Sequence, residues 1–558
     1  MPEPVDNVTV QLLRNRVASL MEEMHYHFFR SGYSTIVRES RDFSCVITDR
    51  NGRIPVAPPM ILHAPVYFHL ISRILQIYDG TLEDGDVVLC NHPYEGNLPH
   101  ASDFAVVAPI FHADELVAFA GSIAHKPDIG GVVPGSTYGQ ATEMFQEGML
   151  LPPVKLYSAG RRDDDLLRLI GANSRQPRLL LGDLDGQVGV LQLARERLAG
   201  LCAGFGASVF AAAIESTIAA SAREFRHALS GLPDGTHEAE GFLDSDGVDR
   251  DRPVRLHVRA TVQRGELTID LTGCDPQCKG PVNLRRALIE SCCFYAIIGL
   301  IDPMLRYSDG AREVVRIVTK PGSVVDARPP AAASTYITSS MKLMDVLLAA
   351  LGPFKPERAI AHSGGTGGAM TLAWHGEPRR ANQYEIFGSS YGAAANGDGL
   401  SGVTVHLSNI RGTPVEILES EFPCRLRRFE LIPDSGGAGR HRGGMSFRRE
   451  YEVLAPATLI YRCDRAKFAP QGLSGGCEGA KSRLTLHPGT DRAQIMPSSC
   501  RVELVPGDTF EIRAAAGGGF GPPQERDSAA LREDIENGYV SIEGLAREYG
   551  RRVDEFSS

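Results

Sequence analysis

The sequence predicts a mixed α/β fold (an α+β arrangement) of several segments, with an N-terminal helix, a mixed sheet that carries the candidate site, and a β-rich C-terminal third. Three patterns predict this class. Residues 8–31 place apolar side chains at three- and four-residue spacing, which is typical of an amphipathic helix. Short apolar runs bounded by turn residues follow it, as in CVITD and DFAVVAPIF. Residues 421–525 then contain strand-like runs separated by glycine clusters.

The first half of the chain alternates helices with short strands. The opening helix ends near residues 31–32, and the Asn-Gly pair at residues 51–52 predicts a hairpin after the strand CVITD. The runs GDVVLCNHPYEG, DFAVVAPIF and ELVAFAGSIAH are typical of strands with polar, Gly- or Pro-rich tips, where functional groups usually lie. Residues 183–229 are rich in Ala, Leu, Arg and Glu and predict one or two long helices.

The second half contains more strands. Alternating residues predict a hairpin with its turn at residues 264–265, and the apolar helix that follows ends at the Asp-Pro pair of residues 302–303. The segment SSMKLMDVLLAALG predicts another helix. Strands are predicted for RLRRFELI, MSFRREYEVL, ATLIYR, SRLTLH and DTFEIRAA. The final segment, DSAALREDIENGYVSIEGLAREYG, predicts two short amphipathic helices.

Changes of pattern divide the 558 residues into four regions, in keeping with the usual size of a folding unit. Residues 1–229 form an α/β region with the candidate metal site. Residues 230–420 form a central α/β region with Gly-rich loops, residues 421–525 a β-rich region, and residues 526–558 a helical tail. No repeat with a period of roughly 20–50 residues is visible, which argues against a solenoid.

Composition narrows the class of function. Apolar residues make up 43% and charged residues 23%, as in ordinary globular proteins. The formal net charge of −10 argues against a general affinity for nucleic acid or anionic membrane. The start of the chain does not resemble a signal peptide, and the most apolar stretch, residues 292–301, is about half the length of a membrane span. The eleven cysteines contain no CxxC pair, so reduced thiols and a cytoplasmic location are expected.

Four possible metal ligands lie within the first 130 residues. Asp42 precedes one predicted strand, His100 and Asp103 follow another, and His125 ends a third. Two imidazoles and two carboxylates suit a divalent zinc, manganese or iron ion, which lowers the pKa of bound water toward neutrality. With 16 His and 68 acidic residues, about two His-x-x-acid matches are expected by chance. The spacing alone therefore does not distinguish a metal site from coincidence.

Two possible nucleophiles have simpler explanations. The segment GSSYG at residues 388–392 matches the G-x-S-x-G elbow around Ser390, with Asp398 and His406 in triad order. An elbow needs a helix directly after the serine, and AAANGDGLSG follows instead, so a Gly-rich turn is favoured. Cys45 is favoured as a buried strand residue rather than a nucleophile.

The remaining Gly-rich segments do not predict a nucleotide site. Residues 364–368 and 517–521 lack the GK[ST] ending and the strand-turn-helix context of a phosphate loop, so tight turns are expected and no cofactor-binding residue is assigned. His63 and His406 lie beside Gly- and Pro-rich segments. Either a substrate-binding or a structural role fits them.

Taken together, several motifs resemble the hydantoinase B/oxoprolinase family, and the resemblance spans nearly the whole chain. The segment TEMFQEGMLLPPVKL (residues 142–156) is the most specific match. The other matching motifs, in chain order, are RESRDFS (38–44), GDVVLCNHPYEG (85–96), GPVNL (280–284), SGVTVHLSNIRGTPVEILE (401–419), DSGGAGRHRGG (434–444), and PGD with GGGFG (506–521).

The resemblance implies the B-type subunit of an ATP-dependent amidohydrolase that opens a cyclic amide or imide such as a hydantoin, oxoproline or a lactam. It implies a hetero-oligomer with an A-type, actin-like ATPase subunit, which binds ATP and Mg and phosphorylates the substrate. It also implies one divalent metal, zinc before iron or manganese, on Asp42, His100, Asp103 and His125. Of these, Asp103 and His125 are the expected catalytic residues.

The chain departs from the family pattern at two positions near the expected ligands. The family's Asn-Asp-Pro is Asn91-His92-Pro93 here, and the second of two paired histidines is Lys126. These changes put the substrate range and the metal identity in doubt, although all four expected ligands remain.

Two other functions stay open. The same resemblance includes subunits of ATP-dependent acetone and acetophenone carboxylases, in which enol phosphate formation and carboxylation use similar parts. The second alternative is a non-catalytic scaffold that completes its partner, against which the four candidate ligands count.

Overall fold

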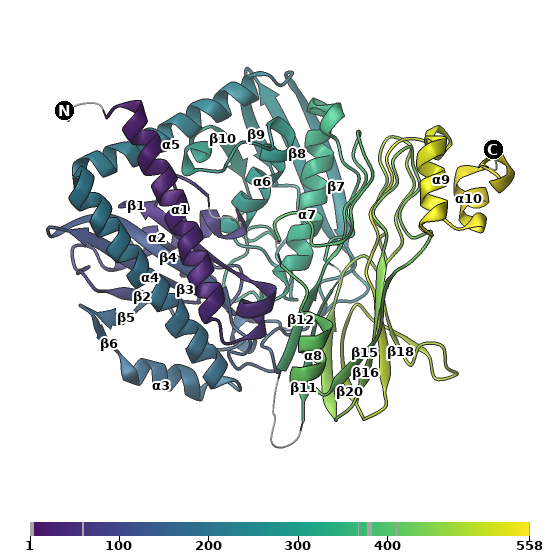
Figure 1. Cartoon of the computed structure of the whole chain (residues 1–558), viewed down its shortest axis with the longest axis horizontal. Helices are drawn as coiled ribbons and strands as arrows, with labels where there is room; N and C mark the ends of the chain where they lie inside the picture. Colours follow the sequence, from purple (N-terminus) through teal and green to yellow (C-terminus); the bar gives the residue numbers. More distant parts are fainter. Residues whose placement is uncertain (1–4, 58–60, 367, 376–381, 409, 557–558) are drawn as a thin grey trace. The chain divides into compact units, whose positions relative to one another are not determined.

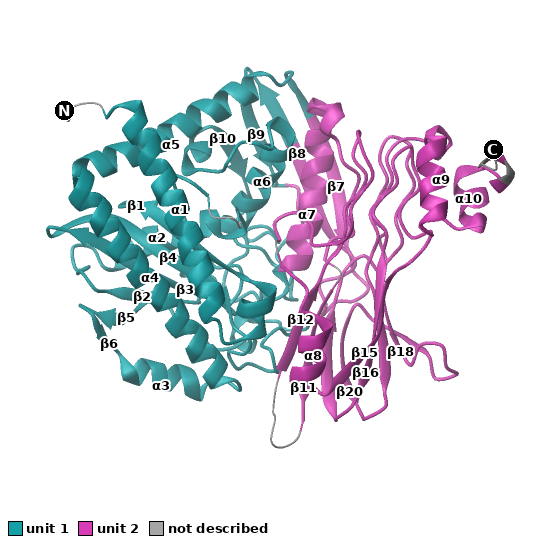
Figure 2. Ribbon diagram, in the orientation of Figure 1, with its two compact units in different colours: residues 1–236, 260–272, 276–336 teal, residues 237–259, 273–275, 337–558 magenta. Residues whose placement is uncertain are grey.

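The computed structural model describes residues 5–57, 61–366, 368–375, 382–408 and 410–556 (Figure 1). The chain forms two compact units, coloured separately in Figure 2. Unit 1 consists of Met1–Thr236, Ala260–Thr272 and Pro276–Tyr336, and unit 2 of His237–Arg259, Gly273–Asp275 and Ile337–Ser558. The mixed α/β class is confirmed, whereas the four-part division of the chain stays a prediction.

Helix α1 (Asn7–Ser31) opens unit 1, as the apolar spacing of residues 8–31 predicts. The Asp6 carboxylate caps the helix by accepting the backbone N–H groups of Val8 and Thr9, each at 3.0 Å. The apolar face of the helix is buried against α4, α5 and the first strand of the sheet. The buried residues of this face are Val10, Leu13, Val17, Leu20, Met21, Met24 and Phe28.

A six-stranded sheet forms the centre of unit 1. Its strands lie in the order β1-β4-β3-β2-β5-β6, and every pair is antiparallel, although the sequence predicts a mixed sheet. Three of the pairs, β2–β3, β3–β4 and β5–β6, join consecutive strands, whereas β1–β4 and β2–β5 join strands that are distant in the chain. The strands are β1 (Phe43–Asp49), β2 (Val87–Cys90), β3 (Asp103–His112), β4 (Glu115–His125), β5 (Val154–Ser158) and β6 (Arg161–Arg162).

The hairpin predicted at residues 51–52 is wrong. A turn does form there, because the Asp49 carboxylate accepts the backbone N–H groups of Asn51 and Arg53 at 2.9 and 2.7 Å. No strand forms in the described residues 53–57 after the turn, where Pro55 has no N–H to donate. Strand β1 pairs instead with β4, which lies far along the chain.

The long helical region is confirmed as two helices, α4 (Pro177–Phe205) and α5 (Ala207–Ser230). Gly206 joins them with φ of 90°, a conformation that favours glycine, and the helices are bent by 105° at this point. Helix α4 packs against β3 and β4, so it covers the strands that carry the candidate ligands. The other helices of this part of the chain are α2 (Ala64–Ile77), α3 (Asp164–Ala172) and α6 (Arg286–Ile301).

The hairpin with its turn at residues 264–265 is confirmed by β8 (Val254–Gln263) and β9 (Glu266–Asp270). A four-stranded sheet has the order β10-β9-β8-β7, with β7 at Gly235–Leu243 and β10 at Val315–Val318. Strand β10 pairs with β9 in parallel.

Unit 2 is built largely from strands, as the sequence of its C-terminal part predicts. One sheet has the order β12-β11-β17-β20, another the order β15-β16-β21-β18-β19, and β13 pairs with β14. A shared apolar cluster that includes Trp374, Tyr451 and Phe510 joins residues of the two larger sheets. The strands are β11 (Gly368–Trp374), β12 (Asn382–Phe387), β13 (Ser389–Ser390), β14 (Ser401–Val403), β15 (Cys424–Leu431), β16 (Phe447–Val453), β17 (Ala457–Arg462), β18 (Arg483–Leu486), β19 (Gln494–Met496), β20 (Ser499–Leu504) and β21 (Thr509–Arg513).

The described residues after β10 also form the helices α7 (Tyr336–Leu351), α8 (Val415–Glu421), α9 (Ser528–Glu536) and α10 (Ile542–Tyr549). Among the described residues, the stretch Tyr336–Phe354 is a single helical segment long and apolar enough to cross a membrane, and α4 with α5 passes the same test as a bent pair. In the structure, 83% of the Tyr336–Phe354 window is buried inside the protein. A buried core helix of this length and composition passes the same test.

Candidate metal centre

The β3–β4 hairpin brings two predicted ligands together. Asp103 is the first residue of β3 and His125 the last of β4, and the two residues lie directly opposite each other in the ladder. Opposed residues of an antiparallel pair project from the same face, so both side chains enter one space. His100 precedes β3 by three residues and joins them from the loop.

The three side chains form a tight triangle of possible ligand atoms. His100 Nε2 lies 3.1 Å from His125 Nδ1 and 3.2 Å from Asp103 Oδ1, and His125 Nδ1 lies 3.5 Å from Asp103 Oδ1. Ligand atoms bound at roughly 2.0–2.2 Å to one tetrahedral or octahedral ion are separated by about 3–3.5 Å. The residues present therefore fit a divalent metal.

The three side chains of this triangle are buried, so water does not stabilise their charges. All three residues are about 2% exposed. Burial raises the pKa of Asp103, but its attraction to His100 and the hydrogen bonds from His100 and His125 outweigh this effect, so the pKa lies well below its usual range. Asp103 Oδ2 and His100 Nδ1 are buried without a hydrogen-bond partner among the described residues. A buried carboxylate facing imidazoles is the environment in which a metal cation replaces missing partners.

Asp42 lies beside the triangle at the start of β1. Its backbone oxygen accepts the N–H of His125 at 3.1 Å, because Phe43 pairs with Ala124 in the ladder. Burial raises the pKa of the Asp42 carboxyl to about 6, with an opposing effect of His125 and a further increase from Asp103. The described ligand atoms that lie within 4.8 Å of one another belong to His100, Asp103 and His125. The role of Asp42 as a fourth ligand stays a prediction.

His63, predicted as a substrate-binding candidate, is at the edge of the same cluster. Its Nε2 lies 3.9 Å from Asp103 Oδ2, and its Nδ1 lies 2.9 Å from Ser44 Oγ. Burial lowers the pKa of His63 to about 4; the nearby Asp103 opposes this effect and His100 and His125 add to it. The imidazole is therefore neutral near pH 7.

A hydrogen-bond network defines which nitrogen of His63 carries the proton. Tyr67 donates to the backbone oxygen of Ser44 at 3.0 Å, and Tyr67 and Ser44 share a second bond at 2.8 Å. Because the single Tyr67 proton is used on the backbone, Ser44 Oγ donates to Tyr67 and accepts from His63 Nδ1. This assignment satisfies every bond and leaves His63 Nε2 as an acceptor toward the cluster. Sequence reasoning missed Ser44 and Tyr67, although Ser44 ends the RESRDFS motif.

Two departures from the family pattern have structural roles. His92 Nδ1 accepts the backbone N–H groups of Tyr94 and Glu95, each at 3.1 Å, and so closes the turn before His100. Lys126 is fully buried and donates to Gln187 Oε1 at 2.6 Å. Burial lowers the pKa of Lys126 to about 8, and nearby carboxylates oppose that effect.

Asn91 holds the loop that carries His100. Its side-chain nitrogen donates to the backbone oxygens of Ala101 and Met149 at 2.7 and 2.8 Å, and its oxygen accepts the N–H of Leu151 at 2.6 Å. The most specific sequence motif, residues 142–156, thus supports the ligand loop from behind. Tyr336 also contacts His100 edge-on, with ring centroids 4.9 Å apart, and no sequence signal identified it.

His406 belongs to a second polar cluster, in unit 2. Its Nε2 lies 3.1 Å from Asp345 Oδ1 and 2.9 Å from Ser363 Oγ, and Asp345 also accepts from Arg465 at 2.6 Å. The Asp345 and Ser363 contacts fall on the same nitrogen of His406, which differs from a catalytic triad. The substrate-binding role of His406 stays a prediction.

The two other nucleophile candidates have structural contacts. Ser390 lies in the short strand β13, no helix begins within the described residues 391–408 that follow it, and its hydroxyl donates to the backbone oxygen of Met445. Asp398, the proposed acid of that triad, forms an ion pair with Arg526 at 2.7 Å. Cys45 is buried in β1, and burial raises its pKa to about 12, so the thiol is not a nucleophile near pH 7.

Comparison with known proteins identifies related chains. Residues 6–523 match the family described as hydantoinase B/oxoprolinase. A caprolactamase subunit beta of Pseudomonas jessenii is 28% identical, over 99% of this chain and 97% of the relative. The 5-oxoprolinase 1 of Arabidopsis thaliana is 26% identical, over 92% of this chain but only 42% of that longer protein.

Solved structures share the fold. The ATP-dependent caprolactamase from Pseudomonas jessenii superposes with a TM-score of 0.91 at 24% identity, covering 99% of this chain and 98% of that one. A nucleotide-free acetone carboxylase superposes with a TM-score of 0.88 at 19% identity, covering 98% and 80%. The mixed α/β architecture is therefore that of both proteins.

Proposed function

The chain belongs to the hydantoinase B/oxoprolinase family, and from this premise we propose that it is the metal-carrying, B-type subunit of an ATP-dependent amidohydrolase. The observation that carries the proposal is the buried triangle of His100, Asp103 and His125. Two relatives are named caprolactamase and 5-oxoprolinase, which supports a cyclic amide or imide as substrate. Hydantoins, 5-oxoproline and lactams are the ring classes to test.

The proposed ligands are Asp42, His100, Asp103 and His125, and the proposed ion is zinc before iron or manganese. A divalent ion bound there supplies a Lewis acid and water activated near neutral pH. Asp103 and His125 are the proposed catalytic residues. The ionised Asp103 would orient the attacking water by accepting a hydrogen bond at Oδ2, and His125, opposite it on β4, would help to hold the ion beside Asp103.

We assign substrate binding to His63. Its Nε2 is an acceptor that faces Asp103 Oδ2, also an acceptor, across 3.9 Å. The buried His63 acceptor needs a proton donor, and the N–H of a cyclic amide is such a donor. This position directs the ring toward the ligand triangle.

The proposal includes a second protein. An A-type, actin-like ATPase subunit would bind ATP with Mg and phosphorylate the amide oxygen, which weakens amide resonance before water attacks. The subunit name of the caprolactamase relative supports a partner. So does the 42% coverage of 5-oxoprolinase 1, since that longer chain has room for both activities. We propose a cytoplasmic hetero-oligomer.

The test is reconstitution with the A-type protein and ATP on hydantoin, 5-oxoproline and caprolactam, with the ring-opened acid quantified by mass spectrometry. His125→Ala and Asp42→Ala should abolish ring opening while the fold and partner binding persist. ATP hydrolysis by the complex should continue, because it is assigned to the partner. Full ring opening by His125→Ala would refute the metal-centre proposal.

A ketone carboxylase subunit is the second candidate, and the likeness to acetone carboxylase over 98% of the chain favours it. Incorporation of labelled bicarbonate into acetone or acetophenone by the same complex would identify that activity. Elemental analysis addresses the scaffold alternative, because a scaffold should carry well under one ion per chain.

A further inference from the structure

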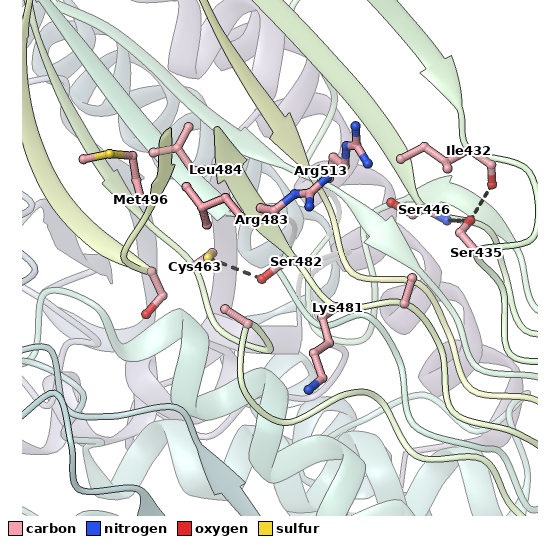
Figure 3. Close-up of a pocket in the computed structure, with 14 residues that line it drawn as sticks. Ile432, Ser435, Ser446, Cys463, Lys481, Ser482, Arg483, Leu484, Met496 and Arg513 are labelled. Carbon is pink, nitrogen blue, oxygen red and sulfur yellow. Dashed lines mark hydrogen bonds between the residues drawn. The ribbon is translucent and has the colours of Figure 1, made fainter. Parts of the chain in front are cut away.

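Unit 2 contains a cavity of about 440 Å³, and none of His406, Asp345 and Ser363 is among its lining residues (Figure 3). Strands β18, β19 and β21 supply part of the lining, and loops before and between strands supply the rest. The volume is sufficient for a small organic molecule. Its polar and charged lining residues include Ser435, Ser446, Lys481, Ser482, Arg483 and Arg513.

The charged groups of this cavity are all positive. Lys481, Arg483 and Arg513 line it, and no carboxylate is among its described lining residues. Figure 3 shows the Arg483 and Arg513 side chains next to each other, with Lys481 on the neighbouring loop. A net-acidic protein therefore concentrates cations at one cavity.

The ladder register makes this arrangement costly. Arg483 and Arg513 lie directly opposite each other on β18 and β21, and Arg513 is also opposite Arg448 on β16. Like charges at opposed positions destabilise a sheet. Glu511 accepts from Arg513 Nε at 2.5 Å and so compensates that arginine. Among the described residues no carboxylate pairs with Arg483, and its Nε is buried without a hydrogen-bond partner.

Three of the four serine hydroxyls in the lining already donate to backbone oxygens. Ser435 donates to the backbone oxygen of Ile432 at 2.5 Å, Ser482 donates to that of Asp464 at 2.7 Å, and Ser446 donates to that of Ala514. The strongest donors left for a ligand are consequently the cationic N–H groups, which bind carboxylate and phosphate oxygens most strongly.

The other walls are apolar, with Ile432, Leu484, Ile495 and Met496 among them. We propose that this cavity binds a small organic anion, with a carboxylate or phosphate group on Arg483, Arg513 and Lys481 and an apolar body against these side chains. The bound anion supplies the negative charge that Arg483 lacks, so binding stabilises unit 2.

Isothermal titration of the full chain tests the proposal with benzoate, phenyl phosphate and the uncharged benzyl alcohol. The wild type should bind at least one of the two anions and should not bind benzyl alcohol, and the preferred anion distinguishes a carboxylate from a phosphate ligand. Arg483→Gln and Lys481→Gln should each weaken binding by about tenfold or more. Arg501→Gln is the matched control, because Arg501 is an exposed β20 residue paired with Glu503 outside the cavity.

Thermal unfolding separates a binding role from a structural one. Without anion, Arg483→Gln should unfold at the same or a higher temperature than the wild type, because the substitution removes a like-charge pair. The anion should raise the unfolding temperature of the wild type and of Arg501→Gln but not that of Arg483→Gln. Lys481 is exposed, so Lys481→Gln should fold and can replace Arg483→Gln in the binding test if Arg483→Gln does not fold. Absence of binding by both anions, or unchanged binding by the two cavity variants, would overturn the proposal.

Discussion

The two units each contain a buried cluster of histidine and aspartate, and the clusters differ in what faces the carboxylate. In unit 1, the ion-pair contacts of Asp103 among the described residues are with imidazoles, including His100 at 3.2 Å and His125 at 3.5 Å. In unit 2, Asp345 forms a 2.6 Å ion pair with Arg465 and a 3.1 Å contact with His406. Similar residue types thus produce two different electrostatic situations.

The two clusters differ in whether the group beside the carboxylate carries a permanent positive charge. Burial raises the pKa of Asp345, but the charge of Arg465 and the hydrogen bond from His406 hold it well below its usual range. A guanidinium is always charged, so the unit 2 cluster is balanced without any ligand. An imidazole is not a permanent cation, so the carboxylate of unit 1 gains most from a metal ion. A histidine-aspartate pair predicts a metal site only when no arginine already binds the carboxylate.

The largest expected effect tests the metal side of this comparison. His100→Ala should lower the bound divalent metal to well under one ion per chain and reduce ring opening on the order of a thousandfold or more, because one corner of the ligand triangle is lost. His406→Ala should keep the metal. Elemental analysis and product assays on both variants measure this contrast, and equal metal loss in the two would contradict it.

The next effect concerns the ion pair of unit 2. Arg465→Met should lower the free energy of unfolding by about 3–5 kcal/mol, because it leaves the Asp345 carboxylate buried without its cation. Metal content should not change. Denaturant unfolding followed by fluorescence and circular dichroism gives the stability, and a loss below about 1 kcal/mol would mean that His406 alone balances Asp345.

A smaller effect is expected at Ser390. The variant Ser390→Ala removes one hydrogen bond to the Met445 backbone and should cost about 1 kcal/mol of stability while most of the activity remains. The assay is ring opening by the reconstituted complex at full metal occupancy. An inactive variant that still carries its metal would instead make Ser390 a nucleophile.

No effect is expected when ATP and magnesium are added to the isolated chain, because neither Gly-rich segment has the features of a phosphate loop. Calorimetric titration should show no heat of binding. Micromolar affinity would place the nucleotide site in this chain and remove the need for an ATPase partner.

Local patterns predicted most elements correctly. Apolar spacing located α1, and alternation with a turn at residues 264–265 located the β8–β9 hairpin. These patterns depend only on residues that are close in the sequence, so they can be recognised without the structure. The hairpin at residues 51–52 failed because β1 finds its partner in β4, a long-range choice that no local signal contains. Ser44, Tyr67 and Tyr336 were missed for the same reason, since their roles depend on contacts with distant residues.

The identity and order of the candidate ligands, and the strand ends that carry them, follow from the sequence alone. Only the tertiary structure decided their register. A bulge in the β3–β4 hairpin pairs Ile110 with Ala118 but Phe111 with Leu116, which shifts the ladder by one residue and sets Asp103 opposite His125. An unshifted ladder would set Asp103 opposite Ala124 and, because side chains alternate between faces, would direct Asp103 and His125 to opposite sides of the sheet.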